Sequence, residues 1–77
     1  MLEGIFAEIL KEIRVNKGLT QEKLAHECQL DRTYISLLER GLRQPTIATL
    51  FKLSAALDIS PDEFIRKILD KYEDNPR

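Results

Sequence analysis

Residues 18–41 read GLTQEKLAHECQLDRTYISLLERG, a stretch in which two short runs of helical periodicity are separated by a few residues. Thr20 is a typical N-cap residue and predicts a helix over about residues 21–28. Asp31 is a second N-cap residue and predicts a helix over about residues 32–40. The stretch therefore predicts two short helices joined by a tight turn.

Four residues of this stretch have the sizes and spacing that a helix-turn-helix motif needs. Ala25 is small where the two helices would cross, and Leu30 anchors the turn between them. Ile35 and Leu38 are spaced to pack the second helix onto the rest of the domain. We therefore expect a helix-turn-helix motif over about residues 20–40.

Apolar residues at helical spacing predict one helix before this motif and two after it. The first helix ends near Gly18, a residue suited to a left-handed C-terminal cap, and its apolar stripe consists of Phe6, Ile9, Leu10 and Ile13. Thr46 caps the fourth helix, whose stripe consists of Ile47, Leu50, Phe51, Ser54 and Leu57.

The fifth helix has the clearest start signal in the chain. Ser60 is its N-cap, Pro61 its first helical residue and Glu63 the partner in a capping box. Its apolar residues are Phe64, Ile65, Ile68, Leu69 and Tyr72. We expect residues 73–77, which are polar, to fray. Five short helices and no alternating strand pattern predict a compact all-α fold in a single domain over residues 1–77.

Composition excludes several classes of function. One cysteine, Cys28, and one histidine, His26, argue against an intramolecular disulfide and a Cys/His metal cluster in these 77 residues. No nucleophile–base constellation or phosphate-binding loop appears, so we expect no enzyme, cofactor, metal or small-molecule ligand. The chain has no apolar run of membrane-spanning length, and its first ten residues lack Lys and Arg. These features predict a cytoplasmic protein with no signal peptide and no membrane partner.

Charge is distributed unevenly along the chain. The net charge is −1, but residues 11–52 carry +3, whereas residues 1–10 and residues 53–77 carry −2 each. A basic middle between acidic ends suits a molecule that presents one side to a polyanion.

The third predicted helix has two separate faces at 100° per residue. Ile35 and Leu38 lie on one face. The opposite face carries Arg32, Thr33, Ser36, Leu37 and Arg40. Arg pairs with guanine, Ser and Thr are adaptable, and an apolar side chain can touch the thymine methyl in a major groove. This pattern favours a base-reading face, although a solvated helix face has the same appearance.

Residues 19–59, LTQEKLAHECQLDRTYISLLERGLRQPTIATLFKLSAALDI, resemble the Cro/C1-type (XRE) helix-turn-helix family of phage repressors and bacterial regulators, with a fold like that of lambda repressor. The resemblance extends over about residues 9–64 and rests on Gly18-Leu19-Thr20-Gln21, Ile35-Ser36, Glu39-Arg40-Gly41, Pro45-Thr46 and Leu50. The small size and the segment Asp31–Ser36 look most like the controller proteins of restriction–modification systems.

The resemblance implies a role for each matching residue. The implied base-reading residues are Arg32, Thr33, Ser36 and Leu37. The implied contacts to the DNA backbone come from Gln21, Tyr34, Arg43, Gln44 and Thr46. Arg14 and Glu39 match a family ion pair that joins the first helix to the recognition helix. Gln29 departs from the pattern, because the family usually has Gly at this left-handed turn position, where another residue costs roughly 1–2 kcal/mol.

A homodimer is expected on two grounds. The apolar arc of the fifth helix is wide for a domain of this size, and the family pairs through its fourth and fifth helices, here residues 46–72. The expected interface residues are Ile59, Phe64, Ile65 and Ile68. Two recognition helices roughly 34 Å apart would then read a palindromic or near-palindromic operator.

The sequence thus predicts a bacterial, nucleoid-associated transcriptional regulator that binds double-stranded DNA in a sequence-specific way. We expect autoregulation and control of restriction–modification genes, with dimer pairs on adjacent sites and RNA polymerase as a further partner. Three alternatives stay open: a phage-type repressor, an antitoxin that also binds a toxin protein through the acidic segment Asp70–Asp74, and a protein-interaction module that has lost DNA binding.

Overall fold

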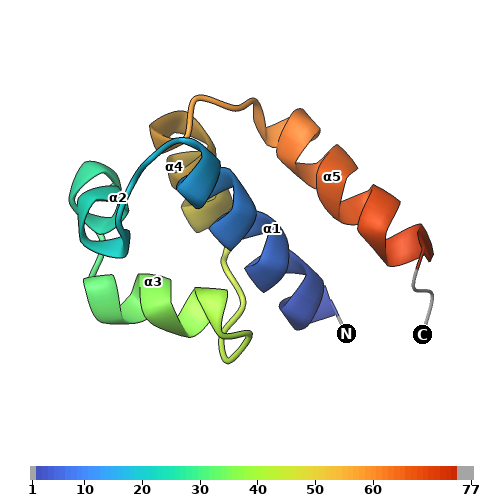
Figure 1. Ribbon diagram of the computed structural model, residues 1–77, viewed down its shortest axis with the longest axis horizontal. Coiled ribbons are helices and arrows are strands. Elements are labelled where there is room, and N and C mark those ends of the chain that lie inside the picture. Colours follow the sequence, from blue (N-terminus) through green and yellow to red (C-terminus); the bar gives the residue numbers. More distant parts are fainter. Residues whose placement is uncertain (1, 75–77) are drawn as a thin grey trace.

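The computed structural model describes residues 2–74, and in this part of the chain all regular structure is α-helical (Figure 1). The five helices are α1 (Leu2–Asn16), α2 (Gln21–Cys28), α3 (Arg32–Glu39), α4 (Ile47–Ala56) and α5 (Pro61–Asp74). The prediction of a five-helix all-α fold is therefore confirmed. Within residues 2–74, no helix has the length and apolar character needed to cross a membrane.

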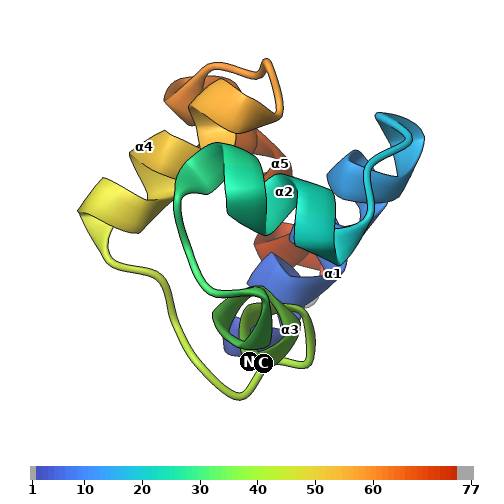
Figure 2. The same cartoon turned by 90° about the vertical axis from the view of Figure 1, so that its left-hand side faces the viewer.

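Helix α1 lies in the middle of the domain, with α3 on one side and α5 on the other (Figure 1). Helix α2 packs against α3 and α4, and α4 in turn packs against α5. In the view from the side of α2 and α3, α2 lies above α3, which is seen nearly end-on, and a short segment joins the two helices (Figure 2). The most deeply buried large side chains come from all five helices and are Leu10, Leu24, Ile35, Leu38, Leu53, Leu57 and Phe64.

The N-caps hold the helix starts where the sequence predicts them. The hydroxyl oxygens of three residues accept a hydrogen bond from the backbone N–H three residues further on, and these residues are Thr20, Thr46 and Ser60. Asp31 is the exception. Its backbone has the extended conformation of an N-cap, but its exposed side chain makes no capping hydrogen bond. Its carboxylate still lies at the positive end of the α3 dipole, which favours a negative charge there.

A residue in the left-handed conformation follows each of the first four helices. Gly18 and Gly41 adopt φ values of 74° and 73°, as glycine does readily. Gln29 takes the predicted left-handed conformation, with φ 57° and ψ 42°, and its backbone N–H bonds to the end of α2. Asp58, with φ 56°, is a second non-glycine residue in this conformation, and sequence reasoning missed it.

The C-terminal end of α5 differs from the prediction. Helix α5 continues to Asp74, so residues 73 and 74 are helical rather than frayed. An ion pair at 3.7 Å joins Lys71 in this last part of α5 to Glu8 of α1. The remaining residues for which fraying was expected, 75–77, lie outside the described part of the chain.

Candidate nucleic-acid interface

Helix α3 separates its buried and exposed residues as the sequence predicts. Ile35 and Leu38 are completely buried in the core. Arg32 and Thr33 are exposed, and Ser36 is partly exposed on the same side. Leu37 is also only partly exposed, so it presents less apolar surface than the sequence suggested. The exposed side of α3 therefore carries charged and hydroxyl groups on a helix whose other side is anchored.

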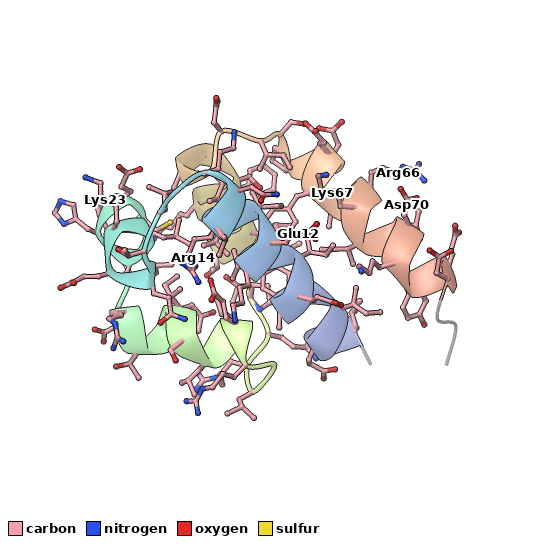
Figure 3. All side chains as sticks on the ribbon, viewed as in Figure 1. Glu12, Arg14, Lys23, Arg66, Lys67 and Asp70 are labelled. Carbon is pink, nitrogen blue, oxygen red and sulfur yellow. The ribbon has the colours of Figure 1, made fainter. Side chains whose placement is uncertain are left out.

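A buried ion pair holds α3 against α1. Arg14 Nε donates to Glu39 Oε2 at 2.6 Å, and Arg14 Nη2 donates to Glu39 Oε1 at 3.0 Å. The side chain of Glu39 is only 2% exposed and that of Arg14 is 11% exposed. The family resemblance implies this pair, and the structure brings the two residues together between α1 and α3. Figure 3 labels Arg14 on α1.

Two further hydrogen bonds extend this ion pair to the start of α2. Arg14 Nη1 donates to the backbone carbonyl of Leu19 at 2.7 Å, and Gln21 Nε2 donates to Glu39 Oε1 at 3.0 Å. The carboxylate of Glu39 thus accepts three hydrogen bonds from side chains of α1 and α2. Sequence reasoning assigned Gln21 to the DNA backbone and missed its contact with Glu39. The network fixes α3 relative to both preceding helices.

The loop between α3 and α4 carries the residues expected to contact the DNA backbone. The Arg43 guanidinium lies over the ring of Tyr34, 5.9 Å from its centroid, and Tyr34 itself packs partly against the core. Gln44 Nε2 donates to Glu3 Oε2 of α1 at 2.6 Å. The hydroxyl of Thr46 caps α4 and donates to Thr49 Oγ1 at 3.0 Å. Tyr34, Arg43, Gln44 and Thr46 all lie on or beside this one loop.

Glu3 is a member of this surface that sequence reasoning missed. Its pKa is lowered from the ordinary value, first because its own backbone N–H donates to the carboxylate and second because Gln44 does. The carboxylate is therefore ionised at neutral pH beside the loop. The sequence offers only its acidic character as a signal, because Glu3 and Gln44 are 41 residues apart.

The predicted dimer residues divide into buried and exposed groups. Phe64 is 0% exposed and stacks on Phe6 with ring centroids 5.6 Å apart, so it cannot contact a second chain directly. Ile68 is also buried, and Ile59 packs partly against the core. The structure thus places Phe64 in the core, whereas Ile68 lines the hollow described below and stays, with Ile59 and Ile65, a predicted interface residue. Of the four, Ile65 has the most free surface.

An exposed apolar surface lies beside these residues, and we call it the α4–α5 face. Four of its residues line one hollow, namely Leu2, Ile47, Ile65 and Tyr72, and the fifth is Phe51, one helical turn beyond Ile47 on α4. Ile47 is 73% exposed and Phe51 57% exposed, although the sequence placed both on the apolar stripe of α4. A hollow of about 550 Å³ opens on this face between α1, α4 and α5, and Leu2, Ile47, Ile65 and Tyr72 are among the residues that line it. Exposed apolar surface of this kind marks interaction sites in soluble proteins.

Cys28 does not form part of either surface. The thiol is buried and donates a hydrogen bond to the carbonyl of Lys52 at 3.6 Å. Burial raises the pKa of the Cys28 thiol, and the negative charge of Glu27 adds to the shift. Within the described residues, no cluster of three or more His, Cys, Asp or Glu side chains could hold a metal ion.

Comparison with known proteins agrees with this geometry. Residues 10–64 match the family model described as helix-turn-helix, and the chain belongs to this family. It is 42% identical over 62 residues to the control protein C.BamHI of Bacillus amyloliquefaciens, an alignment that covers 79% of this chain and 76% of the relative.

Two solved structures are similar along most of the chain. The restriction–modification controller protein C.AhdI from Aeromonas hydrophila has a TM-score of 0.78 and 44% identity, with 80% of this chain and 94% of that chain covered. The wild-type restriction–modification controller protein C.Esp1396I has a TM-score of 0.84 and 38% identity, with 91% and 90% covered.

Proposed function

We propose that this protein is a transcription regulator that binds double-stranded DNA sequence-specifically and controls restriction–modification genes. The observation that carries the proposal is the division of α3 into two faces. Ile35 and Leu38 anchor the helix in the core, while Arg32 and Thr33 are free to reach a base edge. The similarity to C.BamHI, C.AhdI and C.Esp1396I, which are described as controller or control proteins, supports the choice of target genes.

In the proposed complex, α3 lies in the major groove. Arg32, Thr33, Ser36 and Leu37 face the bases, with Arg32 suited to guanine and the partly exposed Leu37 suited to a thymine methyl. The proposed contacts to DNA phosphates come from the start of α2, from α3 and from the loop between α3 and α4, and these residues are Gln21, Tyr34, Arg43, Gln44 and Thr46. Phosphate contacts of this kind set the register of the protein on the duplex, and base contacts set specificity.

The proposed active form is a homodimer that pairs through the α4–α5 face. This face combines projecting apolar side chains, Ile47 and Phe51, with an adjoining hollow. A two-fold dimer needs a surface that is complementary to itself, and a face with both features meets that need. The operator would then be a palindrome or near-palindrome whose half-sites lie about one DNA turn, roughly 34 Å, apart.

Such a dimer has a simple mode of regulation. In this proposal the signal is the concentration of the protein itself. Binding to its own upstream DNA would make it autoregulatory, and dimer pairs on adjacent sites would sharpen the response. The protein would work at the bacterial nucleoid, with RNA polymerase as a partner where the operator adjoins a promoter.

A gel-shift titration tests the proposal. The purified protein is titrated against its own upstream DNA and against a scrambled fragment, at two salt concentrations. We expect tight, salt-sensitive binding to the upstream fragment with dimer stoichiometry. Arg32→Ala should weaken that binding by about 1–3 kcal/mol, or roughly 5- to 150-fold.

Arg66→Ala is the matched control for the loss of one arginine. Arg66 lies on α5, where its guanidinium is exposed and pairs with Asp70 at 3.7 Å (Figure 3). We expect this variant to bind like the wild type. Equal and weak binding to both fragments, or equal effects of the two arginine variants, would contradict the assignment of α3 to base reading. Absence of binding at low salt would favour a protein-interaction role instead.

A further inference from the structure

The first turn of α1 packs directly against the loop after α3. The backbone of Gly41 lies so close to α1 that a Cβ atom placed there would be 3.6 Å from the Cα of Gly4. In the same contact, Gln44 Nε2 donates a hydrogen bond to Glu3 Oε2 at 2.6 Å. Figures 1 and 2 both show the N-terminal end of α1 beside the segment that follows α3.

Two side-chain contacts hold the loop in place, one made by Arg43 and one by the next residue, Gln44. In the first contact, the Arg43 guanidinium lies over the ring of Tyr34 of α3. In the second contact, the Gln44 side chain donates a hydrogen bond to the carboxylate of Glu3. Fixing a loop in its bound conformation before binding reduces the conformational entropy that binding costs. The contact therefore prepares the two polar side chains of the loop for a phosphate.

The same carboxylate has an opposite effect through its charge. In the proposed complex the loop lies against DNA phosphates, and a carboxylate bonded to the loop repels them. Glu3 therefore combines a favourable geometric contribution with an unfavourable electrostatic one. The two contributions belong to different properties of the side chain, its hydrogen-bond acceptor and its charge.

We propose that Glu3 is a positioning residue for the DNA-contacting loop, acting through its hydrogen bond to Gln44. This inference rests on the proposed function. Glu3→Gln keeps an acceptor oxygen for Gln44 and removes the charge, whereas Glu3→Ala removes both. Comparison of these two variants isolates the hydrogen bond.

The experiment measures affinity for the upstream DNA fragment by fluorescence anisotropy at low and high salt. Glu3→Gln should bind about twofold more tightly than the wild type at low salt, and the gain should shrink at high salt. Glu3→Ala should bind about two- to fivefold more weakly than Glu3→Gln. In a Gln44→Ala background this difference between the two Glu3 variants should disappear.

Two controls accompany these measurements. Glu12→Gln removes an exposed carboxylate from the far half of α1 and should change affinity less than Glu3→Gln does. Thermal melting should give the same midpoint for both Glu3 variants, so that neither affinity change reflects loss of folded protein. The proposal is overturned if Glu3→Ala and Glu3→Gln bind equally, or if their difference persists without the Gln44 side chain.

A measurement on the free protein separates this proposal from the function on which it rests. Nitrogen-15 relaxation of the backbone amides should show greater mobility of residues 42–44 in Glu3→Ala and not in Glu3→Gln. If the loop responds in this way but the wild type does not distinguish the upstream fragment from scrambled DNA, the proposed function fails and the loop contact stands. Unchanged loop mobility in Glu3→Ala would refute the positioning role itself.

Discussion

Replacement of Arg14 by alanine tests the structural role of the buried network most directly. The variant leaves the Glu39 carboxylate, which is 2% exposed, with one described donor, Gln21 Nε2. It also removes the donor to the carbonyl of Leu19. Removing one partner of a buried ion pair costs about 3–5 kcal/mol, because the remaining charge has neither its partner nor water.

This loss is large for a domain of 77 residues. At about 0.05–0.15 kcal/mol per residue, the whole domain has a stability of roughly 4–12 kcal/mol. For a domain of this size, 1 kcal/mol corresponds to a shift of about 4–8 °C in melting temperature. Arg14→Ala should therefore lower the melting temperature by at least about 12 °C.

Circular dichroism melts at one fixed protein concentration measure this shift, because a dimer's midpoint depends on concentration. Lys11→Ala is the control, since Lys11 is an exposed basic residue of the same helix. Joint replacement of Arg14 by Met and Glu39 by Leu should recover much of the lost stability, because an apolar pair leaves no charge buried. An unchanged melting temperature together with lost DNA binding would refute the reasoning and place Arg14 at the DNA.

Four further predictions follow from particular side chains. Gln29→Gly should stabilise the domain by about 0.5–1 kcal/mol in urea unfolding, because relief of left-handed strain exceeds the entropic cost of glycine; a loss of stability would contradict this. Ser54→Ala should be neutral or stabilise by up to about 1 kcal/mol in the same assay, because the buried Ser54 hydroxyl has no hydrogen-bond partner. Folding stability should fall as the pH rises above about 8.5, because the Cys28 thiol ionises in the unfolded chain while burial keeps its folded pKa higher, and melts of Cys28→Ala should lack this contribution. Phe51→Glu should shift sedimentation toward the monomer without lowering the monomer's stability, whereas Val15→Glu, at a similarly exposed apolar residue outside the α4–α5 face, should leave the dimer intact.

Local signals explain why the helices could be predicted from the sequence. The hydroxyls of Thr20, Thr46 and Ser60 act on backbone groups three residues away, so each cap and its helix lie within one short stretch. The buried side of α3 follows in the same way from the spacing of Ile35 and Leu38. Asp31 shows the limit, because residue type gives the cap position but not the hydrogen bond.

The contacts that join distant segments could not be predicted by periodicity alone. The ion pair of Arg14 with Glu39 was expected only because the chain resembles a known family. The bonds of Glu39 to Gln21 and of Glu3 to Gln44 cross 18 and 41 residues. A helical wheel shows which residues share a face, but it does not show which neighbouring helix covers that face.

The fifth helix shows the consequence of this limit for the dimer. Its apolar arc serves two surfaces, because Phe64 turns toward Phe6 of α1 while Ile65 and Tyr72 remain exposed. The sequence correctly indicates that the arc is too wide for one buried stripe. Only the packing of α1 and α4 decides which residues of the arc are free, and it assigns Phe64 to the core.

The packing also explains how a chain with a net charge of −1 can present a surface to a polyanion. Arg14 and Glu39 neutralise each other in the interior, so neither contributes to the exterior charge. The exposed Arg32, Arg40 and Arg43 lie on α3 and the following loop, and α1 separates them from the acidic α5 (Figure 1). The domain measures 33 × 24 × 22 Å, whereas charges are screened over about 8 Å at physiological salt. A phosphate beside α3 therefore responds to the nearby arginines and Glu3, and hardly to the acidic residues of α5, so the local arrangement of charge outweighs the net charge.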